Sequence, residues 1–105
     1  NAVTALGLTM SPVTDELRRQ FKLGKKIKGV IITKVANDSP ASEKNIRAGS
    51  IIRKIGPEQK RVDSPAQVKS KVESAREAKL KSLLFLIERG GDPRFVALRL
   101  SKAKS

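Results

Sequence analysis

Short apolar runs alternate with polar stretches along this chain, and their spacing predicts more strands than helices. Apolar and polar side chains alternate after Gly7 within Ala5–Met10, which predicts a first strand. The β-branched run Val30–Val35 predicts a strand buried in the middle of a sheet. The remaining predicted strands are Ser50–Ile55, a short continuation at Arg61–Val62, and the two arms of a hairpin, Leu83–Ile87 and Phe95–Leu100.

Three helices are predicted from their start signals and from apolar positions at helical spacing. The first spans Asp15–Leu23, with acidic residues in its first turn. A Ser-Pro pair starts a short helix at Pro40, which runs to about Asn45, and a longer one at Pro65, because Ser caps the first N–H groups and Pro fits the first helical position. The longer helix runs to about residue 78 and carries the apolar stripe Val68, Val72 and Ala75.

Composition restricts the chemistry that this chain can perform. Its 105 residues suit one domain, and they include no histidine and no cysteine. A Ser-His-Asp or Cys-His nucleophile, a Cys/His metal site and a disulfide are therefore excluded within it. The carboxylates Asp15, Glu16 and Asp92 lie in a helix start or a turn, where structural roles explain them. We expect no catalytic residue, no metal site and no cofactor.

The charge is strongly basic, with 23 Lys and Arg against 10 Asp and Glu, a net charge of +13. Such a charge attracts nucleic acid or an anionic membrane surface, or it belongs to a solvated surface. The second interpretation is favoured, because nucleic-acid folds and Tyr or Trp stacking platforms are absent. No apolar run approaches the ~18 residues of a membrane span. The cations gather in two stretches: Arg18, Arg19, Lys22, Lys25, Lys26 and Lys28, and then Lys69, Lys71, Arg76, Lys79 and Lys81.

Three motifs occur together in the chain. An apolar-Gly-apolar entry, Ala5-Leu6-Gly7-Leu8, precedes the first strand. The block Ser39-Pro40-Ala41 is followed by Ile46-Arg47-Ala48-Gly49-Ser50-Ile51-Ile52, and the Ser64-Pro65 helix is followed by a terminal hairpin. In this combination the chain resembles a PDZ domain of the bacterial HtrA/Deg (Do-like) serine proteases. The hairpin resembles the end of their second, C-terminal PDZ domain, and the resemblance covers roughly residues 5–100.

The resemblance implies a mainly β fold, a PDZ-like, partly open barrel or sandwich of five to six strands capped by two to three short helices. It implies a single domain, 1–105, with its core at about 5–100 and a flexible basic tail at 101–105, cut from a larger protease chain. The parent would be a periplasmic serine endopeptidase whose triad lies elsewhere. Its partners would be unfolded or C-terminal peptide segments, the protease and first PDZ domain of the same chain, and further copies of the parent.

The resemblance also implies a peptide site, and the physics of the entry loop agrees with it. Gly7 lets successive N–H groups face one hollow, and such a nest attracts a carboxylate. The peptide would pair with the edge strand Leu8–Met10 by β-augmentation. The implied carboxylate loop is Ala5, Leu6, Gly7 and Leu8. Leu6, Leu8 and Met10 would form one apolar wall, which predicts an apolar last residue in the peptide. The pairing strand and pocket together would be Leu8, Thr9, Met10, Val68, Lys71, Val72 and Ala75.

Other interpretations of these residues stay open. The same apolar side chains are what a half-buried strand and an amphipathic helix show when they form plain core. The domain could bind peptides and so assist substrate recognition, gating or oligomer assembly. It could instead serve assembly or gating without binding any free peptide, or form a basic module for polyanions.

The sequence departs from the family pattern in three places, one of which is the longer strand turn Gly56-Pro57-Glu58-Gln59 where the family usually has Asn-Gly. Ser50 stands where family members carry Asp, and we expect its hydroxyl to bond locally to the turn. Residues 1–4 carry no cation ahead of the loop, so either the cation lies outside this piece of the chain or a carboxylate would be held by the backbone alone.

Overall fold

The computed structural model describes residues 3–100, which form seven antiparallel strands and three short helices. The elements are β1 Val3–Ala5, β2 Leu8–Pro12, α1 Asp15–Gln20, β3 Val30–Val35, α2 Pro40–Glu43, β4 Ile51–Ile55, β5 Lys60–Arg61, α3 Pro65–Glu77, β6 Ser82–Arg89 and β7 Asp92–Arg99. The predicted mainly β class with two to three capping helices is confirmed, and the sheet has seven strands where five to six were predicted. The predicted tail, 101–105, lies outside the described residues.

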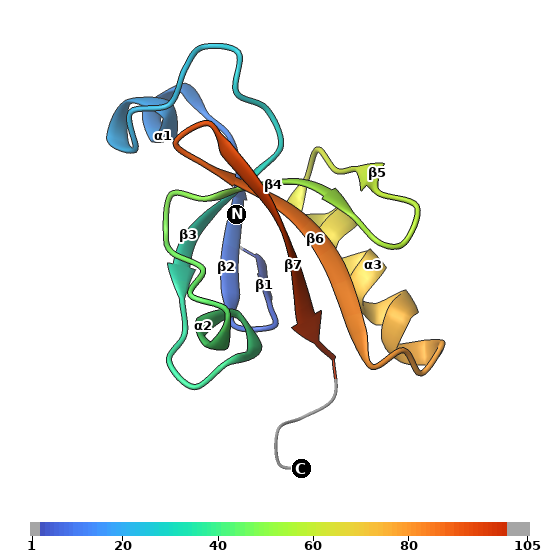
Figure 1. Cartoon of the computed structure of the whole chain (residues 1–105). Coiled ribbons are helices and arrows are strands. Elements are labelled where there is room, and N and C mark those ends of the chain that lie inside the picture. The colour runs from blue at the N-terminus through green and yellow to red at the C-terminus, as the bar shows by residue number, and fades with distance from the viewer. Residues whose placement is uncertain (1–2, 101–105) are drawn as a thin grey trace.

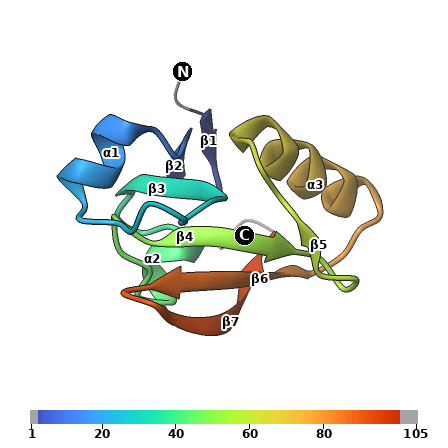
Figure 2. The ribbon, with the colours of Figure 1, turned by 90° about the horizontal axis from the view of Figure 1, so that it is seen from above.

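The strands form one curled sheet in the order β1-β2-β3-β4-β6-β7, and β5 pairs with β4 (Figure 1). Seen from above, α3 lies along the β1 end of the sheet, and α1 lies on the other side of β2 (Figure 2). The segment that alternation predicted as one strand is in fact a hairpin. Leu6 and Gly7 have φ of 55° and 85°, the positive values that a two-residue hairpin turn of type I′ requires, and they separate β1 from β2.

The core fills the inside of the curled sheet and is covered by α2 and α3. The strands contribute Leu8, Met10 and Phe85, each fully buried, and β3 is buried as predicted. Each such large apolar side chain contributes about 1.5–3 kcal/mol relative to exposure. From α3, the buried residues are Pro65, Val68, Val72 and Ala75, so its apolar stripe faces the core.

The helix starts follow the predicted chemistry. The Ser39 and Ser64 side chains accept N–H groups of the first turns of α2 and α3, in reciprocal capping boxes with Ser42 and Gln67. The helix ends are earlier than predicted. Lys22 and Asn45 have φ near 60°, a left-handed conformation that cannot continue a helix, so α1 ends at Gln20 and α2 at Glu43.

The turn before β4 is held by local hydrogen bonds. Ser50 is 2 % exposed, and its hydroxyl donates to the Arg47 carbonyl at 2.7 Å, which confirms the expected local bond. The Gly49 N–H donates to the Ile32 carbonyl at 2.7 Å, which ties this turn to β3. Ser therefore satisfies at this position the local bonding that the turn requires.

Candidate functional site

The predicted carboxylate loop is a closed hairpin turn in this structure. Ala5 lies directly opposite Leu8, with Leu6 and Gly7 as the two turn residues. The residues that flank a two-residue hairpin turn form a hydrogen-bonded pair, so the Leu8 N–H faces the Ala5 carbonyl. The hollow of several N–H groups that we expected at this loop is not open in this conformation, because β1 folds back on β2.

The base of the turn is fixed to the body of the domain. The Gly7 carbonyl accepts the Ala36 N–H at 2.8 Å, and Leu6 is only 7 % exposed. A Cβ at position 7 would lie 2.3 Å from both the Cβ and the Oγ of Ser39, in addition to the strain of a positive φ. Only glycine fits at this position, which explains the apolar-Gly-apolar motif in physical terms.

The strand β1 occupies the outer edge of β2. Its register sets Val3 opposite Met10 and Thr4 opposite Thr9. Since β3 pairs with the other side of β2, Leu8–Met10 is paired on both sides in this conformation, and its use as a peptide-pairing edge stays a prediction. The segment Val3–Ala5 lies between β2 and α3, where a peptide was expected (Figure 2).

The two faces of β1 differ. Val3 and Ala5 are partly buried and pack against the core cluster, whereas Thr4 between them is exposed. On β2, Leu8 and Met10 are fully buried, and Thr9 is half-buried. The alternation shows that β1 presents apolar side chains inward, as an added strand in a groove would.

The α3 residues that line a cleft beside β1 are not those of the predicted stripe. Val68, Val72 and Ala75 are at most 6 % exposed and belong to the core cluster, so they do not line an open cleft. A shallow cleft between β1 and α3 is lined by Val3, Thr4, Ala66, Lys69, Ser70 and Glu73.

The remaining predicted helix residue, Lys71, lies away from this cleft. At 100° per residue it falls on the flank of the buried stripe opposite to Ala66 and Glu73. Lys71 therefore does not line this cleft. Sequence reasoning missed Val3, Ala66, Lys69, Ser70 and Glu73. The helix residues among them could have been found from the sequence, because positions 66, 69, 70 and 73 follow helical spacing and form a second stripe beside the apolar one.

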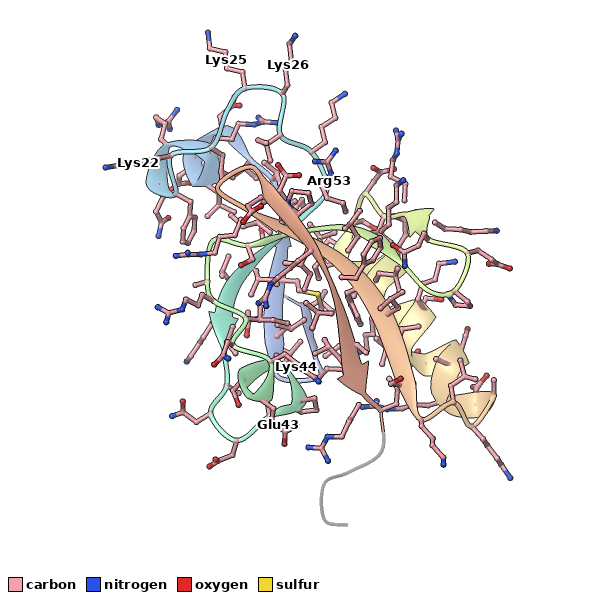
Figure 3. All side chains as sticks on the ribbon, in the orientation of Figure 1. Lys22, Lys25, Lys26, Glu43, Lys44 and Arg53 are labelled. Carbon is pink, nitrogen blue, oxygen red and sulfur yellow. The ribbon has the colours of Figure 1, made fainter. Side chains whose placement is uncertain are left out.

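The two basic stretches lie apart. Lys22, Lys25 and Lys26 point away from the domain at the α1 end (Figure 3), and α3 with its cations lies on the other side of the molecule (Figures 1 and 2). The Arg18 side chain is already engaged, since its guanidinium bonds Asp15 at 2.8 Å and the Ile27 carbonyl at 3.1 Å. The cations therefore do not merge into one stripe.

Within residues 3–100, no group of acidic side chains is placed to hold a metal ion. In the same range, none of the helices has the length and apolarity to cross a membrane.

Comparisons with known proteins agree with this geometry. The chain is 28 % identical, over 99 residues, to a DegP-like periplasmic serine endoprotease of Rickettsia conorii; the match covers 94 % of this chain and 18 % of that protein. The fold is similar to the crystal structure of the HtrA3 PDZ domain bound to a phage-derived ligand, FGRWV, with a TM-score of 0.70 and 20 % identity over 94 % of this chain and 86 % of that one. No family model matches the chain.

The chain thus has the PDZ fold, and it matches a PDZ domain rather than a protease domain. Both findings support the resemblance to PDZ domains of HtrA-type proteases that the motifs indicated. The chain spans about a fifth of the length of the curated relative.

Proposed function

We propose that this chain is a non-catalytic peptide-binding PDZ module of an HtrA-type serine endoprotease that acts in the periplasm. Its ligands are extended or C-terminal apolar segments, which add a strand to β2 beside α3. One observation carries the proposal: an extended segment, Val3–Ala5, already lies antiparallel on β2 against α3. A groove that accepts this strand has the width and the hydrogen-bonding edge that a peptide needs.

The backbone supplies most of the recognition in this proposal. An incoming strand takes the hydrogen bonds of β2, and its last carboxylate meets the N–H groups of the Leu6-Gly7-Leu8 turn once β1 no longer closes it. No cation of the described chain lines the cleft except Lys69, so the carboxylate is held by the turn itself. The buried side chains Val68 and Val72 support the groove from below.

The test is a titration with the peptide FGRWV, with a free carboxylate and amidated, at low and high salt. Binding that requires the free carboxylate and changes little with salt supports the proposal. Equal binding of both forms contradicts the carboxylate loop. Binding that collapses with salt indicates polyanion attraction through counterion release instead.

A second candidate function is assembly or gating without free peptide, through the protease, the first PDZ domain or further copies of the parent. The outer face of the sheet favours it. Phe95 is 62 % exposed and lies opposite Leu86, which in turn lies opposite Lys54, so the three side chains form one row on that face. In the parent protease, Phe95→Ser would lower the oligomer mass measured by light scattering if this role holds, and peptide binding would be unchanged.

A further inference from the structure

We propose that β1 is a resident ligand of the groove: Val3–Ala5 occupies the place of the peptide, and it must swing away at Leu6 before an outside segment binds. Outside segments bind best when they reproduce the Val-x-Ala pattern of β1. This inference rests on the proposed function and adds to it a competitor within the chain and a ligand class. The competitor lowers the apparent affinity by the fraction of molecules in which β1 is released.

The direction of β1 supports this inference. β1 runs antiparallel to β2 and reaches the Leu6-Gly7 turn with its C-terminal end, at Ala5. A peptide whose terminal carboxylate sits at that turn runs in the same direction. β1 therefore imitates a bound peptide in position and polarity, with a peptide bond to Leu6 in place of the free carboxylate.

The attachment of β1 is weak enough for exchange. Within residues 3–100, three residue pairs join it to β2, and its central residue, Thr4, is exposed. Few buried contacts and exposed hydrogen bonds are typical of segments that open locally at low free energy.

A hinge lies where β1 meets the fixed part of the turn. Gly7 is held by the hydrogen bond from the Ala36 N–H, whereas Leu6 adopts a φ of 55° that costs a residue with a side chain about 1–2 kcal/mol. Release of β1 lets Leu6 return to a negative φ while Gly7 stays in place. The strain in the closed hairpin therefore favours opening at this residue.

The burial pattern of β1 defines the ligand class. Val3 and Ala5 point to the core cluster and Thr4 points to solvent. A ligand in the same register presents a β-branched residue two positions before its end, any residue before the last, and a small residue at the end. The matching probe is the five-residue peptide Asn-Ala-Val-Thr-Ala with a free carboxylate, and its control replaces Val with Ser.

The experiment locks β1 in place. Thr4 and Thr9 are opposed at a position next to the hydrogen-bonded pair, where Cα atoms lie about 4.5 Å apart, within the range of a disulfide. The chain has no cysteine, so Thr4→Cys with Thr9→Cys introduces a single bridge. We expect the oxidised protein to bind the probe peptide at least tenfold more weakly than the reduced protein, measured by calorimetry.

A pair of matched single variants tests whether weaker attachment of β1 strengthens peptide binding. Val3→Ser removes a packed side chain of β1 and should tighten probe binding severalfold, whereas Thr4→Ser changes an exposed side chain and should leave it unchanged. The Ser-substituted peptide should bind the unaltered protein more weakly than the probe.

The outcomes separate the inference from the proposed function. Equal binding of the probe by the oxidised and reduced proteins overturns the resident-ligand inference and leaves peptide binding standing. Failure of FGRWV and of the probe to bind any of these proteins, Val3→Ser included, overturns both. Unchanged affinity in Val3→Ser also contradicts the inference, because release of a competitor must raise apparent affinity.

Discussion

The β1–β2 and β6–β7 hairpins of this domain share a turn geometry but differ in the length of their strand pairing and in the burial of their side chains. The turn of β1–β2 has φ of 55° and 85° at Leu6 and Gly7, and the turn of β6–β7 has 62° and 79° at Gly90 and Gly91. Eight residue pairs join β6 to β7, against three for β1 and β2. The longer hairpin also carries Phe85, which is fully buried.

The difference separates a permanent element from an exchangeable one. Glycine adopts a positive φ without steric strain, so the Gly90-Gly91 turn is unstrained, whereas Leu6 at a φ of 55° is strained. The strand β6 also pairs with β4 on its other side, whereas among the strands of residues 3–100 β1 pairs with β2 alone. The same turn therefore closes a structural hairpin at one end of the sheet and a removable strand at the other.

The largest contrast is expected from side-chain truncation in the two hairpins. Phe85→Ala leaves a cavity in the core and should lower the free energy of unfolding by about 3–5 kcal/mol. Val3→Ala removes a partly buried side chain from β1 and should lower it by less than about 1 kcal/mol. Urea denaturation measures both. Comparable losses in the two variants would show that β1 is as firmly packed as β6.

Alanine at the two turn glycines should give the next largest difference. Gly7→Ala combines a positive φ with a contact of 2.3 Å to Ser39, so we expect a loss of about 2–4 kcal/mol. The new Cβ in Gly91→Ala meets nothing within 4 Å, so the free energy of unfolding should fall only by the strain of a positive φ in alanine, about 1–2 kcal/mol. Thermal and urea unfolding measure the pair. A larger loss at Gly91 would contradict the assignment of Gly7 as the anchored residue.

A double variant should show the smallest effect, and it tests whether the loss of stability in Gly7→Ala comes from the contact with Ser39. Ser39→Gly keeps an acceptable helix cap but removes the hydrogen bond from the Ser39 hydroxyl to the Ala36 carbonyl, so alone it should cost about 1 kcal/mol. It also removes the atoms that a Cβ at position 7 would meet, so Gly7→Ala should cost about 1 kcal/mol less in its presence. Strictly additive losses in this cycle would show that the two residues do not interact.

Local signals in the sequence were sufficient for most of the fold. The capping Ser residues, the β-branched run of β3 and the alternation in β7 depend on neighbours within a few positions, and the helix starts appear where these signals placed them. The fold-back of Val3–Ala5 on β2 could not be predicted in this way. Leu-Gly is not a usual hairpin turn, and a three-residue strand has too short a pattern to detect.

The candidate site was predicted only in part, for a related reason. Periodicity identified Val68, Val72 and Ala75 as one apolar face of α3, but the same face suits a groove wall and a core. The structure buries them in the core, and Ala66 and Glu73, on another face of the helix, line the cleft beside β1. The choice between the two roles depends on what lies opposite the helix, which a local pattern does not contain.

The most direct test of the account is amide hydrogen exchange, followed by NMR, in the two hairpins with and without the probe peptide. The account predicts weak protection of Val3 and Ala5 and strong protection of Phe85 and Val96. On peptide addition, Val3 and Ala5 should lose their protection while Phe85 and Val96 keep theirs, because the peptide replaces β1 on β2. Protection of Val3 and Ala5 that equals that of the β6–β7 pair and survives peptide binding would contradict it.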